Sequence, residues 1–220
     1  MKNVFHISPK KFEEDLSDTD LNFSSNYSAE FLNIPPMLEV YWDRIYTNAI
    51  QSWEENKGIN IVPSQAEFVQ YYMNKHSDKF DKYSDNKQDG IRARVLKAYP
   101  SLTREAHFIA LVNKLLIQED FPYTLIISNS RLDLSRGVDL AIQINGVSFS
   151  INITKTDSST DWQKIKAKRK EEVDNPHSVT VVAEEENTFE IGHGETLFLI
   201  KQETVRETLE QCVDIAQGEK

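Results

Sequence analysis

Apolar and polar positions alternate through residues 137–154, and this period of two predicts a β-hairpin. The two alternating runs are separated by Asn145-Gly146, the preferred centre of a type I′ turn, in which both residues need a positive φ. A two-residue loop fixes the pairing of the strands, so we expect Ile144 to face Val147. One face of the hairpin is then built from Val, Leu, Ile and Phe side chains and should belong to the core.

The opposite face of this hairpin carries polar side chains that can bind a ligand. Counting outward from the turn places Asp139 opposite Asn152, with Thr154 as the diagonal neighbour of Asp139. Directly opposed side chains lie about 4.5–5.5 Å apart at Cβ, and diagonal ones a little further. The three residues therefore predict one small polar site. Each of these residue types is also common on the exposed face of a hairpin, so only the three together indicate a binding or catalytic site.

Periodicity elsewhere predicts helices before residue 90 and a mixture of helices and strands after it. The first part is expected to have at most one short helix near residues 9–16, then helices at about residues 37–56 and 64–76, followed by a loop over 77–89. The third of these helices opens with Ser64 and Glu67 at the spacing of a capping box. The elements of the second part are helices at 91–98 and 101–118, a strand at 123–128, the hairpin, a helix at 161–173, strands at 178–183 and 196–201, and a helix at 205–216.

This order predicts an α/β fold with a mixed central sheet flanked by helices. In terms of domains, we expect a flexible N-terminal arm over residues 1–36, a helical accessory region over 37–90 and an α/β core over 91–220. The accessory region is rich in aromatic residues at helical spacing between Trp42 and Tyr72, which suits core packing or a groove for a protein partner.

Composition narrows the class of protein. The chain has 220 residues, a formal net charge of −10 and a pI near 5.0, so it is not expected to coat nucleic acid over its whole surface. Its single cysteine, Cys212, excludes a disulfide framework and a cysteine-rich zinc site. Apolar runs are too short to cross a membrane, and we expect a cytoplasmic protein.

Two groups of basic residues interrupt this acidic chain and point to DNA as a partner. One lies on the predicted helix 161–173, and the other on the helices before the hairpin. They comprise Lys164, Lys166, Lys168, Arg169 and Lys170 in the first group, and Arg92, Arg94, Lys97 and Arg104 in the second. Phosphate contacts dominate affinity for nucleic acid, so such groups can give a local footprint. A solvent-exposed helix, in which the basic side chains form ion pairs with Glu171 and Glu172, explains the first group equally well.

A helix, a hairpin whose first strand begins with Asp, a second helix and a further strand together resemble the core of the PD-(D/E)xK nuclease-like superfamily. This superfamily includes restriction endonucleases and many phage and mobile-element enzymes. The resemblance covers about residues 91–201 and implies a restriction-endonuclease-like fold with an N-terminal helical extension. It also implies Mg²⁺-dependent hydrolysis of DNA, with Asp139 and Glu105 as metal ligands.

The chain departs from the family pattern on the second strand of the hairpin. Where the superfamily has Asp/Glu-x-Lys, this chain has Asn152-Ile153-Thr154, so one acidic ligand and one cation are absent. An amide oxygen of Asn152 is the expected substitute for the ligand. Lys164 or Lys168, one helical turn apart on the next predicted helix, is the expected substitute for the lysine that positions the attacking water.

Three functions therefore remain open. The first is a Mg²⁺-dependent endonuclease of restriction or mobile-element type, for which a homodimer would suit cleavage of both strands. The second is a nuclease-like protein without catalysis that binds DNA or protein. The third is an interaction protein of a mobile element whose aromatic N-terminal helices contact a protein partner. We favour nuclease-related DNA processing.

Overall fold

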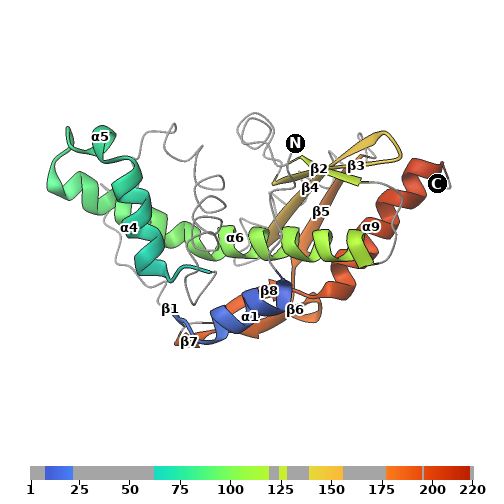
Figure 1. Ribbon diagram of the computed structural model, residues 1–220, viewed down its shortest axis with the longest axis horizontal. Helices are drawn as coiled ribbons and strands as arrows, with labels where there is room; N and C mark the ends of the chain where they lie inside the picture. Colours follow the sequence, from blue (N-terminus) through green and yellow to red (C-terminus); the bar gives the residue numbers. More distant parts are fainter. Residues whose placement is uncertain are drawn as a thin grey trace. The chain divides into compact units, whose positions relative to one another are not determined.

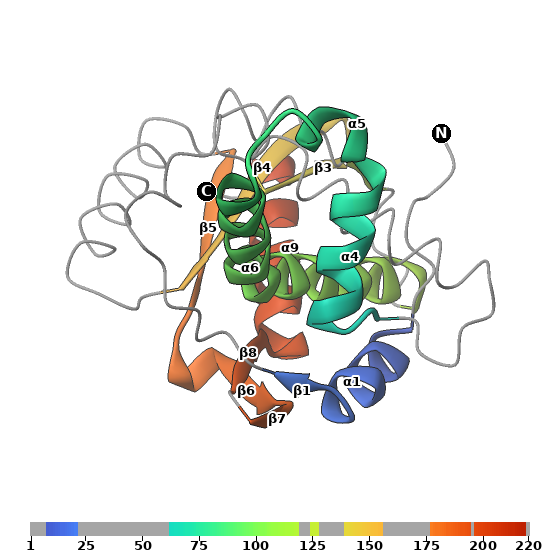
Figure 2. The same cartoon turned by 90° about the vertical axis from the view of Figure 1, so that its left-hand side faces the viewer.

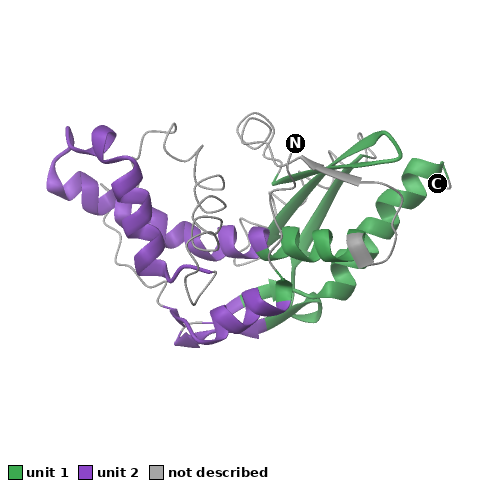
Figure 3. Ribbon diagram, in the orientation of Figure 1, with its two compact units in different colours: residues 1–9, 107–189, 198–220 green, residues 10–106, 190–197 purple. Residues whose placement is uncertain are grey.

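The computed structural model describes residues 8–21, 62–118, 124–127, 139–155, 177–194 and 196–218 (Figure 1). The chain divides into two compact units, drawn in different colours in Figure 3. Unit 1 comprises residues 1–9, 107–189 and 198–220, and unit 2 comprises residues 10–106 and 190–197. The boundary expected between residues 90 and 91 lies inside a continuous helix, and the units divide that helix between Ala106 and His107 instead.

Unit 1 contains a four-stranded mixed sheet with the strand order β2-β3-β4-β5. The strands are β2 (Thr124–Ile127), β3 (Leu140–Ile144), β4 (Val147–Lys155) and β5 (Ser178–Ala183). β3 is antiparallel to both β2 and β4, whereas β5 runs parallel to β4, and Figure 2 shows β4 and β5 side by side. The predicted α/β class with a mixed sheet is confirmed.

The hairpin of β3 and β4 has the predicted turn and register. Asn145 and Gly146 have φ values of 50° and 84°, as a type I′ turn requires. Ile144 pairs with Val147, and the ladder continues from there to the far end of β3. The predicted apolar face is buried around Ile142, Phe149 and Ile151, which are at most 1% exposed, whereas Val147 beside the turn is half-buried. The hairpin therefore forms the centre of the core of unit 1.

Two helices contribute to the same core. The C-terminal half of α6 (Asp85–Gln118) and α9 (Gln202–Gln217) each bury an apolar stripe, formed by Phe108, Val112 and Leu115 on α6 and by Val205, Leu209 and Cys212 on α9. α9 packs against β3. The ammonium group of Lys114 donates a hydrogen bond of 2.6 Å to Oε1 of Gln202, which joins the two helices.

The predicted helix break at Tyr99-Pro100 is wrong, because α6 continues through Pro100. Pro100 lacks the N–H that would bond the carbonyl of Leu96, and its ring crowds that carbonyl, but a long helix that is packed on other elements can absorb this cost. Ser101 or Thr103 is the expected N-cap of a second helix, but both lie inside α6, and the Thr103 hydroxyl donates to the carbonyl of Tyr99 at 2.7 Å within the same helix.

The loop expected at residues 77–89 is also largely helical. It contains α5 (Ser77–Phe80), and α6 already begins at Asp85. Phe80 is buried and stacks on Tyr72 with ring centroids 5.7 Å apart. One aromatic contact from this polar segment therefore holds it against α4 (Gln65–Lys75), a contact that hydrophobic periodicity alone does not reveal.

The capping box that opens α4 is confirmed. The hydroxyl of Ser64 accepts a hydrogen bond from the backbone N–H of Glu67 at 3.3 Å, and the Glu67 carboxylate accepts from the Ser64 N–H at 2.9 Å. The phenol of Tyr99 donates to the carbonyl of Pro63 at 2.7 Å, just before this cap. Both contacts fix the position at which α4 begins beside α6 in unit 2.

Residues 8–21 contain the short helix expected near residues 9–16, but they are packed into the fold and do not form a flexible arm. They form α1 (Pro9–Ser17) and β1 (Asp20–Leu21), and β1 pairs in parallel with β7 (His193–Gly194). Phe12 and Leu16, one helical turn apart, are fully buried. The burial of these two side chains holds the segment in place, although its average composition is polar.

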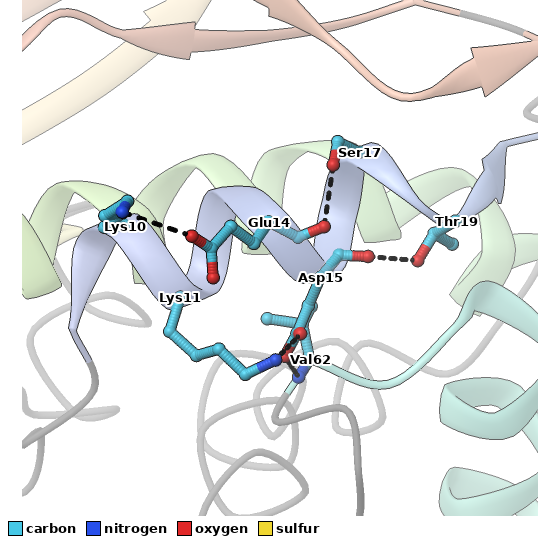
Figure 4. A network of polar contacts seen from close by, with 7 residues as sticks. All are labelled: Lys10, Lys11, Glu14, Asp15, Ser17, Thr19 and Val62. Carbon is cyan, nitrogen blue, oxygen red and sulfur yellow. Dashed lines mark hydrogen bonds and ion pairs between the residues drawn. The ribbon is translucent and has the colours of Figure 1, made fainter.

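A buried carboxylate also ties α1 to the rest of unit 2 (Figure 4). Asp15 is 2% exposed, accepts a hydrogen bond from Lys11 Nζ at 2.5 Å, and accepts a second one from the backbone N–H of Val62 at 3.3 Å. The hydrogen bond to Asp15 raises the pKa of Lys11 above its usual value. The Asp15 carboxylate therefore joins two segments that lie 47 residues apart in the sequence.

The strand expected at 196–201 is present as β8 (Leu197–Ile200), but it pairs with β6 (Thr188–Ile191) in a separate small sheet. A 3₁₀ turn, η2 (Glu185–Asn187), leads into β6. The helices predicted at residues 37–56 and 161–173 lie outside the described residues. None of the helices in the described ranges has both the length and the apolar character needed to cross a membrane.

Candidate functional site

A row of polar side chains crosses the sheet of unit 1 from β3 to β5. Asn152 on β4 is the register partner of Thr180 on β5. On the other side of β4, the antiparallel ladder pairs Leu140 with Ile151, so the residue before β3, Asp139, lies beside Asn152. We refer to Asp139, Asn152 and Thr180 as the polar row. The pairing of Asp139 with Asn152 is the one that the turn predicts, whereas the contribution of β5 is new.

Asp139 is fixed by the backbone of β4. Its Oδ2 accepts a hydrogen bond of 2.5 Å from the backbone N–H of Ile153. β3 begins only at Leu140, so this carboxylate satisfies a donor that would otherwise bond a carbonyl of the neighbouring strand. The side chain is half-buried. Asp139 therefore has a structural role, and that role holds its carboxylate at the end of the polar row.

Asn152 is buried, with 6% of the residue exposed to solvent. It lies on β4, an interior strand of the sheet with β3 and β5 on either side. Its Oδ1 has no hydrogen-bond partner among the described residues. Leaving a buried polar atom unpaired costs about 1–3 kcal/mol, and such an atom in a native structure calls for a bound water, ion or ligand.

Thr180 is the residue of the polar row that the sequence analysis missed. Its Oγ1 is buried and, like the amide oxygen of Asn152, has no hydrogen-bond partner in the described part of the chain. Threonine is common in strands, so the sequence of β5 gives no signal that singles it out. Only the register of β5 against β4 reveals that Thr180 lies beside Asn152.

The other predicted ligands are placed differently. Thr154 is half-buried and pairs in register with Val182, so its neighbour on β5 is apolar. Glu105 on α6 is half-buried and belongs to unit 2, whereas Asp139 belongs to unit 1. Within the described ranges there is no group of three or more His, Cys, Asp or Glu residues that could hold a metal ion.

The donor set of the polar row nevertheless fits one kind of metal ion. Each residue of the row carries a side-chain oxygen, and Mg²⁺ is a hard ion that prefers oxygen ligands. Mg²⁺ usually keeps several waters and binds proteins through one or two carboxylates. Asp139 can supply the carboxylate and Asn152 an amide oxygen. The row therefore fits a hydrated divalent cation with a single negative ligand.

The predicted DNA-binding residues differ in exposure. Arg92 is exposed and forms an ion pair of 2.7 Å with Asp89, a contact that is weak at a surface and can be exchanged for a phosphate. Arg94 is half-buried, and Arg104 is only 5% exposed, so in this structure Arg104 does not offer its guanidinium to a phosphate in solvent. Lys164, Lys166, Lys168 and Arg169 lie outside the described residues.

Comparisons of the chain with protein-family models, with curated proteins and with solved structures gave no match.

Proposed function

We propose that this protein is a nuclease-like DNA-processing protein whose polar row binds a divalent cation. Support for the fold comes from the order of the elements in unit 1, where a helix precedes three antiparallel strands and a fourth strand parallel to the third. Asp139 stands at the start of the second strand and Asn152 near the end of the third. These are the positions at which the PD-(D/E)xK superfamily, which the sequence resembles, carries its acidic ligands.

The observation that carries the proposal is the buried Oδ1 of Asn152, which has no hydrogen-bond partner among the described residues, on the strand position next to the fixed carboxylate residue Asp139. An amide oxygen and a carboxylate are acceptors, so together they favour a cation or a donor and repel a phosphate group. Replacing the acidic residue of the family pattern by Asn removes the charge but keeps an oxygen at that position. The chain therefore retains a ligand for a metal ion, with a lower expected affinity.

Each residue then has a defined task. A bound Mg²⁺ ion would supply Lewis acidity toward a phosphodiester and a water molecule. Asp139 would hold the ion, and the hydrogen bond from Ile153 fixes the orientation of its carboxylate. Asn152 provides an uncharged oxygen. Lys164 and Lys168 stay our candidates for positioning the attacking water, and Arg92 and Arg94 for contacting the phosphate backbone.

A second candidate function is binding without turnover. It is favoured by the Asn152-Ile153-Thr154 sequence at the Asp/Glu-x-Lys position, and by the fact that the described residues offer one carboxylate to the ion rather than a cluster. In that case the polar row binds the cation and organises the sheet, and the protein binds DNA without cleaving it.

Cleavage of supercoiled plasmid tests the proposal directly. We expect the wild-type protein with Mg²⁺ or Mn²⁺ to nick the plasmid, EDTA to abolish nicking, and Asp139→Asn to lower the rate about tenfold or more because it removes the only charge of the row. Asn152→Asp should raise the rate at low Mg²⁺, since it restores the acidic ligand. Ser148→Ala, on an exposed position of the same strand, is the matched control and should cut like wild type.

The same assay separates the two candidate functions. An intact plasmid together with retained DNA binding in a gel-shift assay would favour the binding protein over the nuclease. Nicking that is equal in the wild type, Asp139→Asn and EDTA-treated samples would contradict the role of the polar row.

A further inference from the structure

Two buried oxygen atoms that have no hydrogen-bond partner in the described part of the chain belong to neighbouring residues of the polar row. Asn152 and Thr180 are register partners on adjacent parallel strands, and residues paired in this way present their side chains on the same face of a sheet. Oδ1 of Asn152 and Oγ1 of Thr180 are both shielded from solvent, and neither has a hydrogen-bond partner in the described part of the chain. Such atoms are rare in native proteins, so two in one row point to a common ligand.

The hydrogen-bonding groups of the polar row determine which class of ligand can bind there. The carboxylate of Asp139 and the amide oxygen of Asn152 accept hydrogen bonds, and the hydroxyl of Thr180 can both accept and donate. A phosphate or another anion would lie against hydrogen-bond acceptors and the negative charge of Asp139, which disfavours its binding. A cation that keeps its water shell fits instead, because the water molecules donate hydrogen bonds outward to oxygen atoms.

We infer that Thr180 is a third binding residue of the cation site, and that its hydroxyl accepts a hydrogen bond from a water molecule of the hydrated ion. This inference rests on the proposed function, since it takes the ligand of the row to be a divalent cation. It extends the site from the hairpin to β5, which no feature of the sequence indicates. Asp139 supplies the charge of the site, Asn152 an amide oxygen, and Thr180 a contact to the water shell.

The inference predicts a specific combination of effects for Thr180→Val. Valine has nearly the same shape but no hydroxyl, so it removes an unpaired polar atom from the metal-free protein and a hydrogen bond from the metal-bound protein. We expect the Kd for Mn²⁺ and for Mg²⁺ to rise about threefold to tenfold in calorimetric titrations of the full chain. The Tm in EDTA should stay unchanged or rise. Thr180→Ser, which keeps a hydroxyl, should bind close to wild type.

Ser178→Ala is the matched control, because Ser178 lies on the same face of β5, two residues before Thr180, and pairs with Ser150. It should leave both the Kd and the Tm unchanged. Asn152→Leu serves as the reference for the site itself and should weaken binding more than Thr180→Val does.

The outcomes separate this inference from the proposed function. If Asn152→Leu weakens metal binding and Thr180→Val does not, the role of Thr180 is overturned and the cation site stands. If the wild-type protein binds neither ion, both fail. A clear drop in the Tm of Thr180→Val in EDTA would also overturn the inference, because it would show that the hydroxyl has a structural partner in the metal-free protein.

Discussion

At the scale of single residues, Asp139 combines a structural and a proposed ligand role. One of its oxygen atoms accepts the N–H of Ile153 and so fixes the beginning of β3 against β4. A carboxylate that is already held by the backbone loses little freedom when it binds an ion, which favours binding. The two roles can be separated by substitutions that keep or remove the acceptor.

We predict that Asp139→Ala lowers the free energy of unfolding by about 2 kcal/mol, because the N–H of Ile153 loses a charged acceptor. Asp139→Asn keeps an acceptor oxygen and should cost less than about 1 kcal/mol, while its metal binding is lost. Urea unfolding in EDTA measures both values. Equal stability of Asp139→Ala and the wild type would contradict the structural role.

Sequence reasoning identified Asp139 and Asn152 as neighbours but missed Thr180, and the difference has a physical reason. The two-residue turn between β3 and β4 leaves one register, so the pairing can be counted from Asn145-Gly146. β5 is parallel to β4 and reaches it through a long connection, which imposes no register. The partner of Asn152 on β5 therefore could not be derived from the sequence.

At the scale of elements, two glycines show which constraints act on the turn between β3 and β4 and on the β1–β7 pair. Gly146 and Gly194 both have a positive φ, of 84° and 82°, but differ in their surroundings. A Cβ at Gly146 would meet nothing within 4 Å, whereas one at Gly194 would lie 2.7 Å from the carbonyl oxygen of Leu21. The hairpin turn thus requires only a backbone conformation, and the β1–β7 pair also requires close approach of two backbones.

We predict that Gly146→Ala costs about 1 to 2 kcal/mol of stability through its positive φ alone. Gly194→Ala should cost about 1 kcal/mol or more beyond that, because the added methyl group forces β1 away from β7. Urea denaturation ranks the two variants, and hydrogen exchange at Leu21 and His193 should increase only in Gly194→Ala. A larger loss for Gly146→Ala would contradict this explanation.

The elements that the sequence analysis misjudged all depend on tertiary contacts. Pro100 is a helix breaker by its local chemistry, yet α6 continues because both of its halves bury apolar residues. The short helix near residues 9–16 is present as α1, but the flexible arm expected around it is instead held in place by Phe12, Leu16 and the Asp15 network (Figure 4). By contrast, the capping box of α4 and the turn of the hairpin are local signals, and both were predicted correctly.

At the scale of the whole molecule, the sequence was sufficient for the α/β class and the mixed sheet, because the hairpin and the strands around it carry clear periodic patterns. The division into units was not predictable in the same way. α6 contributes residues to both units, and no change of composition marks Ala106 and His107 as the boundary.

The most direct test of this account is a calorimetric titration of Mg²⁺ into the full chain, comparing wild type, Asn152→Leu and the control Ser148→Ala. We predict that wild type and Ser148→Ala bind the ion equally, and that Asn152→Leu raises the Kd about tenfold or more, equivalent to about 1.4 kcal/mol or more. Equal binding by Asn152→Leu and wild type, or no binding by wild type, would contradict the central claim that the polar row is a cation site.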